Sequence, residues 1–545
     1  MRIKQYAQIL CKLADYLTSV QRENGDFPDR VNYGFTFSVL LWLFEQGKYK
    51  KNINKAIDAF NNQDKTDKEF PWEFNNYAIL KIIKYCPEYT KSLSVDYLKN
   101  KGTPVTNWRL LRLVNKARIE GRISKKDLEF KKVLKLTSSE GLICDEPNTR
   151  SFQYHCFSVF LMGELSLITK DKDIEEIFLK AALWIANRIL SNGQALYLGR
   201  GQEQIFGYGA LLFVIELAYK LTEHQFFSEK ATKVLTYLST FQRDDGSFPL
   251  VLRHNDKEQV LLTVKDKPYG WFSYNTLFDY MPFLGYCLTE CIRISETSVN
   301  KIKYEGLDIT QNSDKIFYIK KRGYEAVWAI PTKGRGYWND EMPVPYIIKG
   351  IPITPIYGGD PIWTDIYSPA LIPLPYGIVK TSLLNKRLFF NLSFKIKNRL
   401  SHWCYKNYYR QIFDDEIPYF FANQLGYKYT PLGFRGENLW FQHKRNFWFS
   451  EEMVQISDTI RFKKEMELSS FYSLNLFLFH CGIREKNKGL LVAEGPNFEI
   501  KIERIEGKIL IDEQLSPLGR LIWIREDIGS LVRGVINRRV EICLK

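Results

Sequence analysis

The 545-residue chain lacks the long apolar segments of membrane and exported proteins. It has no run of 18 or more apolar residues, which a membrane-spanning helix requires. Its first residues, MRIKQYAQILCKLADYL, form an amphipathic pattern without the apolar block and small-residue cleavage site of a signal peptide. We therefore expect no membrane span and a cytoplasmic location, or a periplasmic or secreted one if a signal has been removed.

The sequence also lacks the short motifs of cofactor and metal chemistry. Its nine cysteines include no CxxC pair, and there is no HExxH, no phosphate-binding loop, no dinucleotide fingerprint and no Cys/His zinc spacing. Several cysteines stand within apolar stretches, which is typical of buried free thiols. We expect no cofactor and no metal.

Acidic residues are in the minority. The chain has 77 Lys and Arg against 62 Asp and Glu, a formal net charge of +15. Such a surplus attracts polyanions, but the basic residues are scattered and form no nucleic-acid motif. Aromatic residues make up 15% of the chain, which suits large cores or a cleft that binds sugar rings. The expected partner is an acidic polysaccharide or oligosaccharide rather than nucleic acid.

The first half contains an internal repeat. YLTSVQRENGDFP at 16–28 is matched by YLSTFQRDDGSFP at 237–249, and related loops place glycines at 141, 193 and 246, about fifty residues apart. Each loop precedes a helix rich in aromatic residues, and amphipathic helices lie between them. Six inner helices are predicted to start near residues 32, 74, 107, 153, 206 and 271. The pattern predicts an (α/α) toroid of about six helical hairpins.

The pattern changes near residue 300. Alternating segments such as RLFFNLSFKI, MVQISDTIRFKKEMEL and FEIKIERIEGKILI follow one another without intervening helices, separated by turn signals. Strands in series favour an antiparallel β-sandwich. We predict an α+β multidomain protein, with the toroid over residues 1–300 and the sandwich, with cleft-facing loops, over 301–545.

Unusual polar residues stand at the predicted starts of the inner helices, where helix N-termini would gather at one mouth of the toroid. Apolar inner helices do not need these groups for packing, whereas a binding site does. The candidates for substrate binding are Asn76, Asn107, Gln153, Tyr154 and Gln204, together with Arg150 and Arg200 in the preceding loops, and the candidates for catalysis are His155 and Tyr208.

Two of these segments resemble polysaccharide lyases of the heparinase II/III and alginate lyase type. FQYHCFS supplies His155, and RGQEQIFGYGALL supplies Tyr208 one repeat later, after an arginine–glycine loop. The resemblance implies a toroid followed by an antiparallel sandwich, and a histidine from the sheet domain that completes the site. We place His402 in that role ahead of His443 and His480. The sequence departs from the family at Tyr154, where the family has the asparagine that neutralises the substrate carboxylate.

The reaction that the resemblance implies is β-elimination from a uronic acid. The carboxylate is neutralised, a base removes the C5 proton, and an acid protonates the leaving oxygen. Gln153, Gln204, Asn107 and Arg150 are alternatives for the neutralising group. Tyr208 is expected to act as base and acid, with its pKa lowered by Arg200.

Two other functions fit the same architecture. An inverting glycoside hydrolase needs two carboxyl groups about 6.5–9.5 Å apart. Asp145 or Glu146 with Glu203, one repeat apart, are the candidates, and Asp29 is a further one. The third alternative is a non-catalytic protein that binds or assembles polysaccharide.

Overall fold

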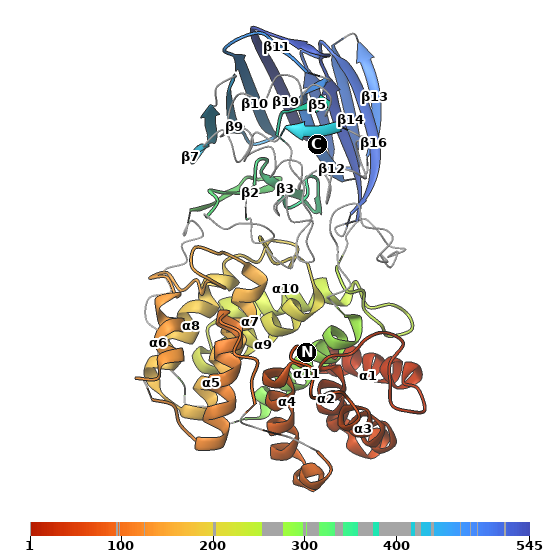
Figure 1. Cartoon of the computed structure of the whole chain (residues 1–545), viewed down its shortest axis with the longest axis vertical. Helices are drawn as coiled ribbons and strands as arrows, with labels where there is room; N and C mark the ends of the chain where they lie inside the picture. The colour runs from red at the N-terminus through yellow and green to blue at the C-terminus, as the bar shows by residue number, and fades with distance from the viewer. Residues whose placement is uncertain are drawn as a thin grey trace. The chain divides into compact units, whose positions relative to one another are not determined.

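The computed structural model consists of a helical unit followed by a unit of strands (Figure 1). It describes residues 2–93, 96, 99–124, 126–199, 203–252, 276–297, 301, 315–332, 340, 342–357, 374–380, 416–419, 427–437, 441–468, 470–479, 481–487, 489–516 and 519–545. The predicted boundary at residues 300 and 301 lies between the last described helix and the first described strand.

The helical unit alternates outer and inner helices along the chain. The inner helices are α2 (Gly34–Trp42), α4 (Trp72–Tyr85), α5 (Thr106–Glu120), α7 (Phe152–Thr169), α9 (Ile205–Thr222) and α11 (Leu277–Glu296). The outer elements are α1 (Arg2–Val20), α3 (Gln46–Asn61), η2 (Pro87–Lys91), α6 (Leu128–Lys135), α8 (Lys172–Ala186) and α10 (Gln225–Ser239), and a short turn η1 (Leu43–Glu45) joins α2 to α3.

The inner helices form a closed ring. Each packs against the next in the order α2, α4, α5, α7, α9 and α11, and α11 packs against α2. This confirms the predicted toroid of six hairpins. Five inner helices begin within two residues of the predicted starts, and the sixth begins at Leu277, six residues after Trp271.

The repeated turn explains why the outer layer also closes. Gly25, Gly141, Gly193 and Gly246 all have positive φ, and each lies against the carbonyl of a lysine in the next outer helix, so a Cβ atom at any of them would overlap that oxygen. The last of these contacts joins Gly246 to Lys12 in α1 and so connects the end of the series to its beginning.

Helices α7 and α9 are enclosed on nearly every side. All residues of α7 from Phe152 to Ser166 are buried. Within the described part of the chain, α9 is the one helix long and apolar enough to cross a membrane by length and composition, and 78% of that segment is buried inside the protein. Its place in the inner ring accounts for this composition.

The second unit is built from antiparallel strands in four sheets. The four-stranded sheet contains β1 (Ile316–Lys320), β2 (Glu325–Ala329), β3 (Tyr346–Lys349) and β4 (Ile351–Pro352). The eight-stranded sheet has the order β13 (Gly482–Asn487), β14 (Leu490–Gly495), β15 (Phe498–Glu503), β19 (Val535–Leu544), β10 (Met453–Phe462), β9 (Phe441–Phe449), β8 (Gly433–Glu437) and β7 (Lys428–Thr430). The five-stranded sheet has the order β16 (Lys508–Ser516), β17 (Gly519–Asp527), β12 (Ser470–Phe479), β5 (Tyr376–Lys380) and β6 (Glu416–Tyr419), and β11 (Met466–Glu467) pairs with β18 (Leu531–Val532).

The two large sheets pack face to face. Phe471 of the five-stranded sheet contacts Phe441 and Phe462 of the eight-stranded sheet, with ring centroids 6.1 and 5.1 Å apart. Arg538 of β19 forms a buried ion pair with Glu526 of β17. These contacts confirm the predicted sandwich, and the order of ring and sandwich is the architecture that the resemblance to heparinase-type lyases implies.

Candidate active site

Aromatic side chains follow one another across the N-terminal ends of the inner helices. Tyr33, the residue before α2, stacks on Phe74 of α4 with ring centroids 4.6 Å apart, and Phe74 stacks on Phe157 of α7 at 5.7 Å. Phe157 contacts Phe206 of α9 at 6.1 Å, and Phe206 lies 4.6 Å from Tyr280 of α11. These five rings, which we call the aromatic array, span five of the six inner helices.

Part of the aromatic array reaches the surface. Tyr33 and Phe74 are half-buried, and so is Trp108 of α5, whose ring centroid is 5.1 Å from that of Phe74. The other three rings of the array are buried. The N-terminal mouth of the ring therefore presents aromatic faces beside buried rings, which suits a ligand with apolar and polar faces such as a sugar.

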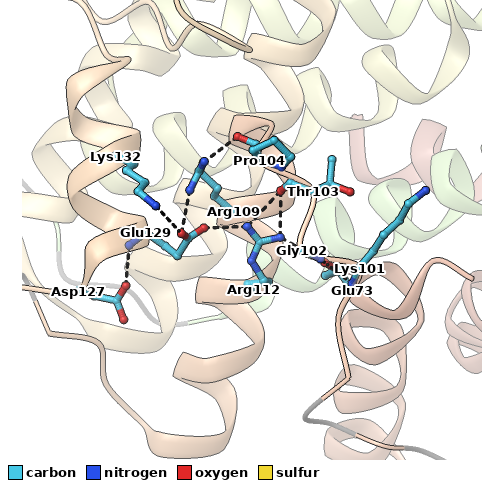
Figure 2. A network of polar contacts seen from close by, with 10 residues as sticks. All are labelled: Glu73, Lys101, Gly102, Thr103, Pro104, Arg109, Arg112, Asp127, Glu129 and Lys132. Carbon is cyan, nitrogen blue, oxygen red and sulfur yellow. Dashed lines mark hydrogen bonds and ion pairs between the residues drawn. The ribbon is translucent and has the colours of Figure 1, made fainter. Parts of the chain in front are cut away.

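The loop beside Trp108 is fixed by a network of polar contacts (Figure 2). Glu73, buried in the first turn of α4, accepts hydrogen bonds from the backbone N–H groups of Lys101 and Gly102 at 3.0 and 3.3 Å. Arg112 joins Glu73, at 3.2 Å, to Glu129 of α6, at 2.7 Å. The wall of the mouth at residues 101–104 is thus held by three helices.

Two glutamines join α7 to α9 at the mouth. Gln153 donates to Oε1 of Gln204 at 2.9 Å and accepts from the Gln204 backbone N–H at 3.1 Å. Both are 0% exposed, and Nε2 of Gln204 has no hydrogen-bond partner among the residues that the structure describes. The buried Oδ1 atoms of Asn107 and Asn76 are also unpartnered, whereas Nδ2 of Asn76 binds the carbonyls of Asp96 and Lys99. A donor group of the Gln204 amide is therefore buried directly before α9 without a partner in the described part of the chain.

Tyr208 lies between α9 and the outer layer. Its ring packs on those of Tyr197 and Tyr237, and its hydroxyl donates to Oε2 of Glu203 at 2.8 Å and accepts from the Ala195 N–H at 3.3 Å. The side chain is 0% exposed. Burial and the charge of Glu203 raise the pKa of Tyr208 well above its usual value, so the expectation of a lowered pKa was wrong.

His155 occupies the equivalent position of the preceding repeat. Its Nδ1 accepts from the Ile143 N–H at 2.9 Å, its Nε2 lies 3.3 Å from the Ala181 carbonyl, and its ring meets the Trp184 ring edge-on at 4.7 Å. Burial lowers the pKa of His155 to about 3. Like Tyr208, it is the fourth residue of its helix and binds the N–H two residues after a turn glycine, so both side chains anchor loops.

Of the remaining predicted residues, Arg150 and Tyr154 lie in the described part of the chain. Arg150 is 1% exposed with its guanidinium 5.8 Å from the centroid of Phe152, and the ring of Tyr154 lies edge-on to Phe206 at 5.6 Å. Arg200, His402 and His480 lie outside the described residues.

His443 is buried in the sheet unit, where Nε2 lies 2.7 Å from Asp458 and Nδ1 lies 2.8 Å from the Tyr427 hydroxyl. Asp458 also binds Arg445 through both carboxylate oxygens at 2.7 Å. Among the described residues, no three His, Cys, Asp or Glu side chains gather as a metal ion would require.

Glu203 is the buried carboxyl nearest the start of α9. It has a left-handed backbone, with φ of 57°, and its side chain accepts from Gln194 at 2.9 Å and from Tyr208. Burial raises its pKa to about 7, because the neutral donors around it only partly favour the ionised form. Of the other candidates for the hydrolase pair, Asp145 is 1% exposed, Glu146 is half-buried and Asp29 is exposed.

Sequence reasoning missed the aromatic array. Its members are residue types that are common in any protein core. Only the spacing of these aromatic residues along their helices could have identified them from the sequence. Phe206 and Phe213 lie seven residues apart, and Phe157 and Phe160 three apart, on the faces that meet across the ring. Tyr208 lies two residues after Phe206, which places it about 200° around the helix and toward the outer layer.

No protein-family model matches the sequence, and no curated protein matches it. Among solved structures, the chain is similar to a family 88 glycosyl hydrolase from Bacteroides vulgatus, with 13% identity and a TM-score of 0.37 over 54% of this chain and 99% of that one. It is similar to a type II terpene cyclase from Scytonema, at 9% and 0.37 over 54% and 99%, and to a heparinase III, at 10% and 0.34 over 96% and 80%. These proteins carry different activities, so the assignment of function rests on the residues of this chain.

Proposed function

We propose that the protein binds an acidic polysaccharide at the N-terminal mouth of the helical ring and cleaves it by β-elimination. The observation that carries the proposal is the aromatic array, whose rings Tyr33 and Phe74 are half-buried. Gln204, two residues before Phe206 of the array, has a buried amide N–H without a partner among the described residues. Aromatic faces stack on sugar rings, and a few placed polar groups fix their orientation. The net charge of +15 favours an acidic polymer.

Gln204 is the best candidate for the group that neutralises the carboxylate. A carboxylate only accepts hydrogen bonds, so the neutralising group must donate. The unpartnered atom of Gln204 is Nε2, a donor, whereas that of Asn107 is Oδ1, an acceptor. Gln204 also directly precedes α9, where the N-terminus of the helix favours negative charge.

The proposal does not require Tyr208 or His155 to transfer protons. The contacts of both side chains support a role in holding the loops at residues 142–144 and 194–196. Proton transfer by either residue stays a prediction, and the Tyr208 variant described below tests it.

The direct experiment is to incubate the protein with alginate, polygalacturonate or heparin and to record near-ultraviolet absorbance. β-Elimination leaves a C4–C5 double bond that absorbs there. Gln204→Leu should lower the rate roughly 10- to 100-fold, the worth of a hydrogen bond to a charged group. Phe74→Ala should lower kcat/KM by about 2- to 10-fold through lost stacking. Phe226→Ala, which removes a half-buried ring from outer helix α10, is the matched control and should have no effect.

A glycoside hydrolase is the second candidate, because the pKa of Glu203 is raised to about 7. A carboxyl that keeps its proton near neutral pH can act as a general acid. A hydrolase would release reducing ends without the ultraviolet absorbance and would lose activity in Glu203→Gln. Binding without either product would overturn both enzymes in favour of a non-catalytic binding protein.

A further inference from the structure

One edge of the eight-stranded sheet carries three cations in a row. Lys428 of β7 stands directly opposite Arg435 of β8, and Arg435 stands opposite Lys444 of β9. All three side chains are exposed. We call these residues the cationic row. Neighbouring strands are about 4.8 Å apart, so the row places three positive charges along a short line across the strands.

No ion pair joins the cationic row to any residue that the structure describes. The same outer face is arranged differently two and three strands beyond β9, where the row ends. There Lys501 of β15 stands opposite Glu541 of β19, and Arg539 stands opposite Glu503 and pairs with it at 3.9 Å. Like charges placed directly opposite each other on a sheet are destabilising, whereas opposite charges stabilise. The cationic row therefore costs stability. The other like-charged pair of this face, Glu494 opposite Glu499, is compensated, because Arg484 pairs with Glu494 and Lys501 pairs with Glu499.

The nearby acid Glu437 offsets only part of the row. The pKa of Glu437 is lowered mainly by Gln442 and Lys463, and Lys428 contributes last. Glu437 lies two residues after Arg435 on the same face, but its carboxylate binds Lys463 at 3.1 Å and Gln442 at 2.8 Å. Arg461 on β10, opposite Gln442, is a further exposed cation of this face. The balance of charge at this edge is positive.

Neutral polar groups and one aromatic ring adjoin the cationic row. Thr459 and Asn537 continue it onto the next two strands and bind each other at 3.1 Å. Asn446 and Trp448 follow Lys444 on the same face of β9, and Trp448 is 53% exposed. Hydroxyl and amide groups beside a flat ring match the hydroxyl groups and faces of sugars.

We propose that this face of the eight-stranded sheet is a second, non-catalytic binding site for an acidic polysaccharide chain, whose carboxylates or sulfates bind the cationic row while a sugar ring stacks on Trp448. The observations favour this ligand over single-stranded nucleic acid, which is bound by several aromatic side chains that stack successive bases. The ligand class rests on the proposed function, but the site lies on the sheet unit and needs no residue of the helical mouth.

Binding of the full-length protein to alginate, polygalacturonate and heparin, by calorimetry at low and high salt, tests the site. The Lys428→Gln/Arg435→Gln/Lys444→Gln variant should bind at least one of these polymers about tenfold more weakly at low salt. The slope of log affinity against log salt should become shallower by roughly two to three, as for the loss of that many charge contacts. Trp448→Ala should weaken binding without changing the slope, and Trp448→Phe should restore most of the affinity.

Lys50→Gln/Lys51→Gln/Lys131→Gln, three exposed cations of the outer helices, removes the same charge and should bind like the wild type. Equal affinity of the row variant and wild type for all three polymers would overturn the site. Tighter row-dependent binding of poly(dT) or of phosphatidylserine vesicles would overturn the choice of polysaccharide. Cleavage assays on the wild type and the row variant separate the two proposals. If the wild type cleaves none of the polymers but still binds them through the row, only the proposed function is overturned.

Discussion

Glu203 and Glu290 are both buried glutamates of the helical unit, but their pKa values shift in opposite directions. Glu203, near the N-terminal mouth, has neutral partners, and burial raises its pKa to about 7. Burial acts in the same direction on Glu290, near the C-terminal end of α11, but the charges of Lys81 and Arg293 outweigh it and lower the pKa of Glu290.

The difference extends to the two ends of the ring. At the C-terminal end, Lys81 of α4 pairs with Glu164 of α7 at 2.9 Å and with Glu290 of α11, while Arg118 of α5 pairs with Glu164. These four buried side chains tie together four inner helices. At the mouth, aromatic rings and amides join the helices, and the amides of Gln204, Asn107 and Asn76 each keep one buried atom without a partner in the part of the chain that is described. One end of the ring is thus closed by paired charges, while the other keeps the groups that we propose bind a ligand.

The largest expected loss of stability comes from disrupting the buried ion pairs at the C-terminal end of the ring. Lys81→Met should lower the free energy of unfolding by about 3–5 kcal/mol, because it leaves two buried carboxylates without a shared partner. Urea denaturation measures it. Adding Glu290→Gln to this variant should recover part of the loss, since one of those charges is then removed.

Asp15→Asn is the control for that variant. It breaks the exposed Lys48–Asp15 pair, 2.7 Å long, and should cost less than about 1 kcal/mol. Equal losses in Lys81→Met and Asp15→Asn would show that the buried cluster does not join the helices.

A second, smaller effect concerns the pH dependence at the mouth. The folded-state pKa of Glu203, about 7, exceeds its ordinary value of 4.5, so the folded protein holds this proton more tightly than the unfolded chain. The stability that results is complete below about pH 4.5 and is lost as pH rises through about 7, a change of about 3 kcal/mol.

Unfolding of the wild type and of Glu203→Gln at pH 5 and pH 8 tests this dependence. Glu203→Gln should lack this part of the pH dependence, so its stability relative to the wild type should improve at pH 8. Identical pH profiles for the two proteins would contradict the raised pKa.

The smallest effect is expected for Tyr208→Phe. The hydroxyl binds both Glu203 and the Ala195 N–H, so its removal should lower the free energy of unfolding by about 1–2 kcal/mol. Tyr237→Phe is the matched control and should cost less, because its hydroxyl lies 3.4 Å from Glu203. If Tyr208 also transfers protons, turnover should fall by about 10²- to 10⁴-fold, and wild-type turnover would exclude that role.

The starts of the inner helices could be predicted because their signals are local. A turn with a glycine such as Gly193 or Gly246, followed by an apolar segment, marks the same step in each repeat whatever the rest of the chain does. Strand alternation is equally local and marked the change to an antiparallel sandwich. Gln153 and Gln204 were also found from sequence, and the structure brings them into contact across α7 and α9.

The direction in which side chains point was decided only by the tertiary structure. Hydrophobic periodicity shows the buried face of a helix when the other face is polar, but α7 and α9 are buried on nearly all sides. Hydrophobicity alone therefore does not distinguish the interior of the ring from the outer layer, and only the spacing of the large aromatic residues carries a signal. His155 and Tyr208 therefore suggested a catalytic pair, although both face the outer helices. The partners of Lys81 are 83 and 209 residues away along the chain, and only closure of the ring brings them together.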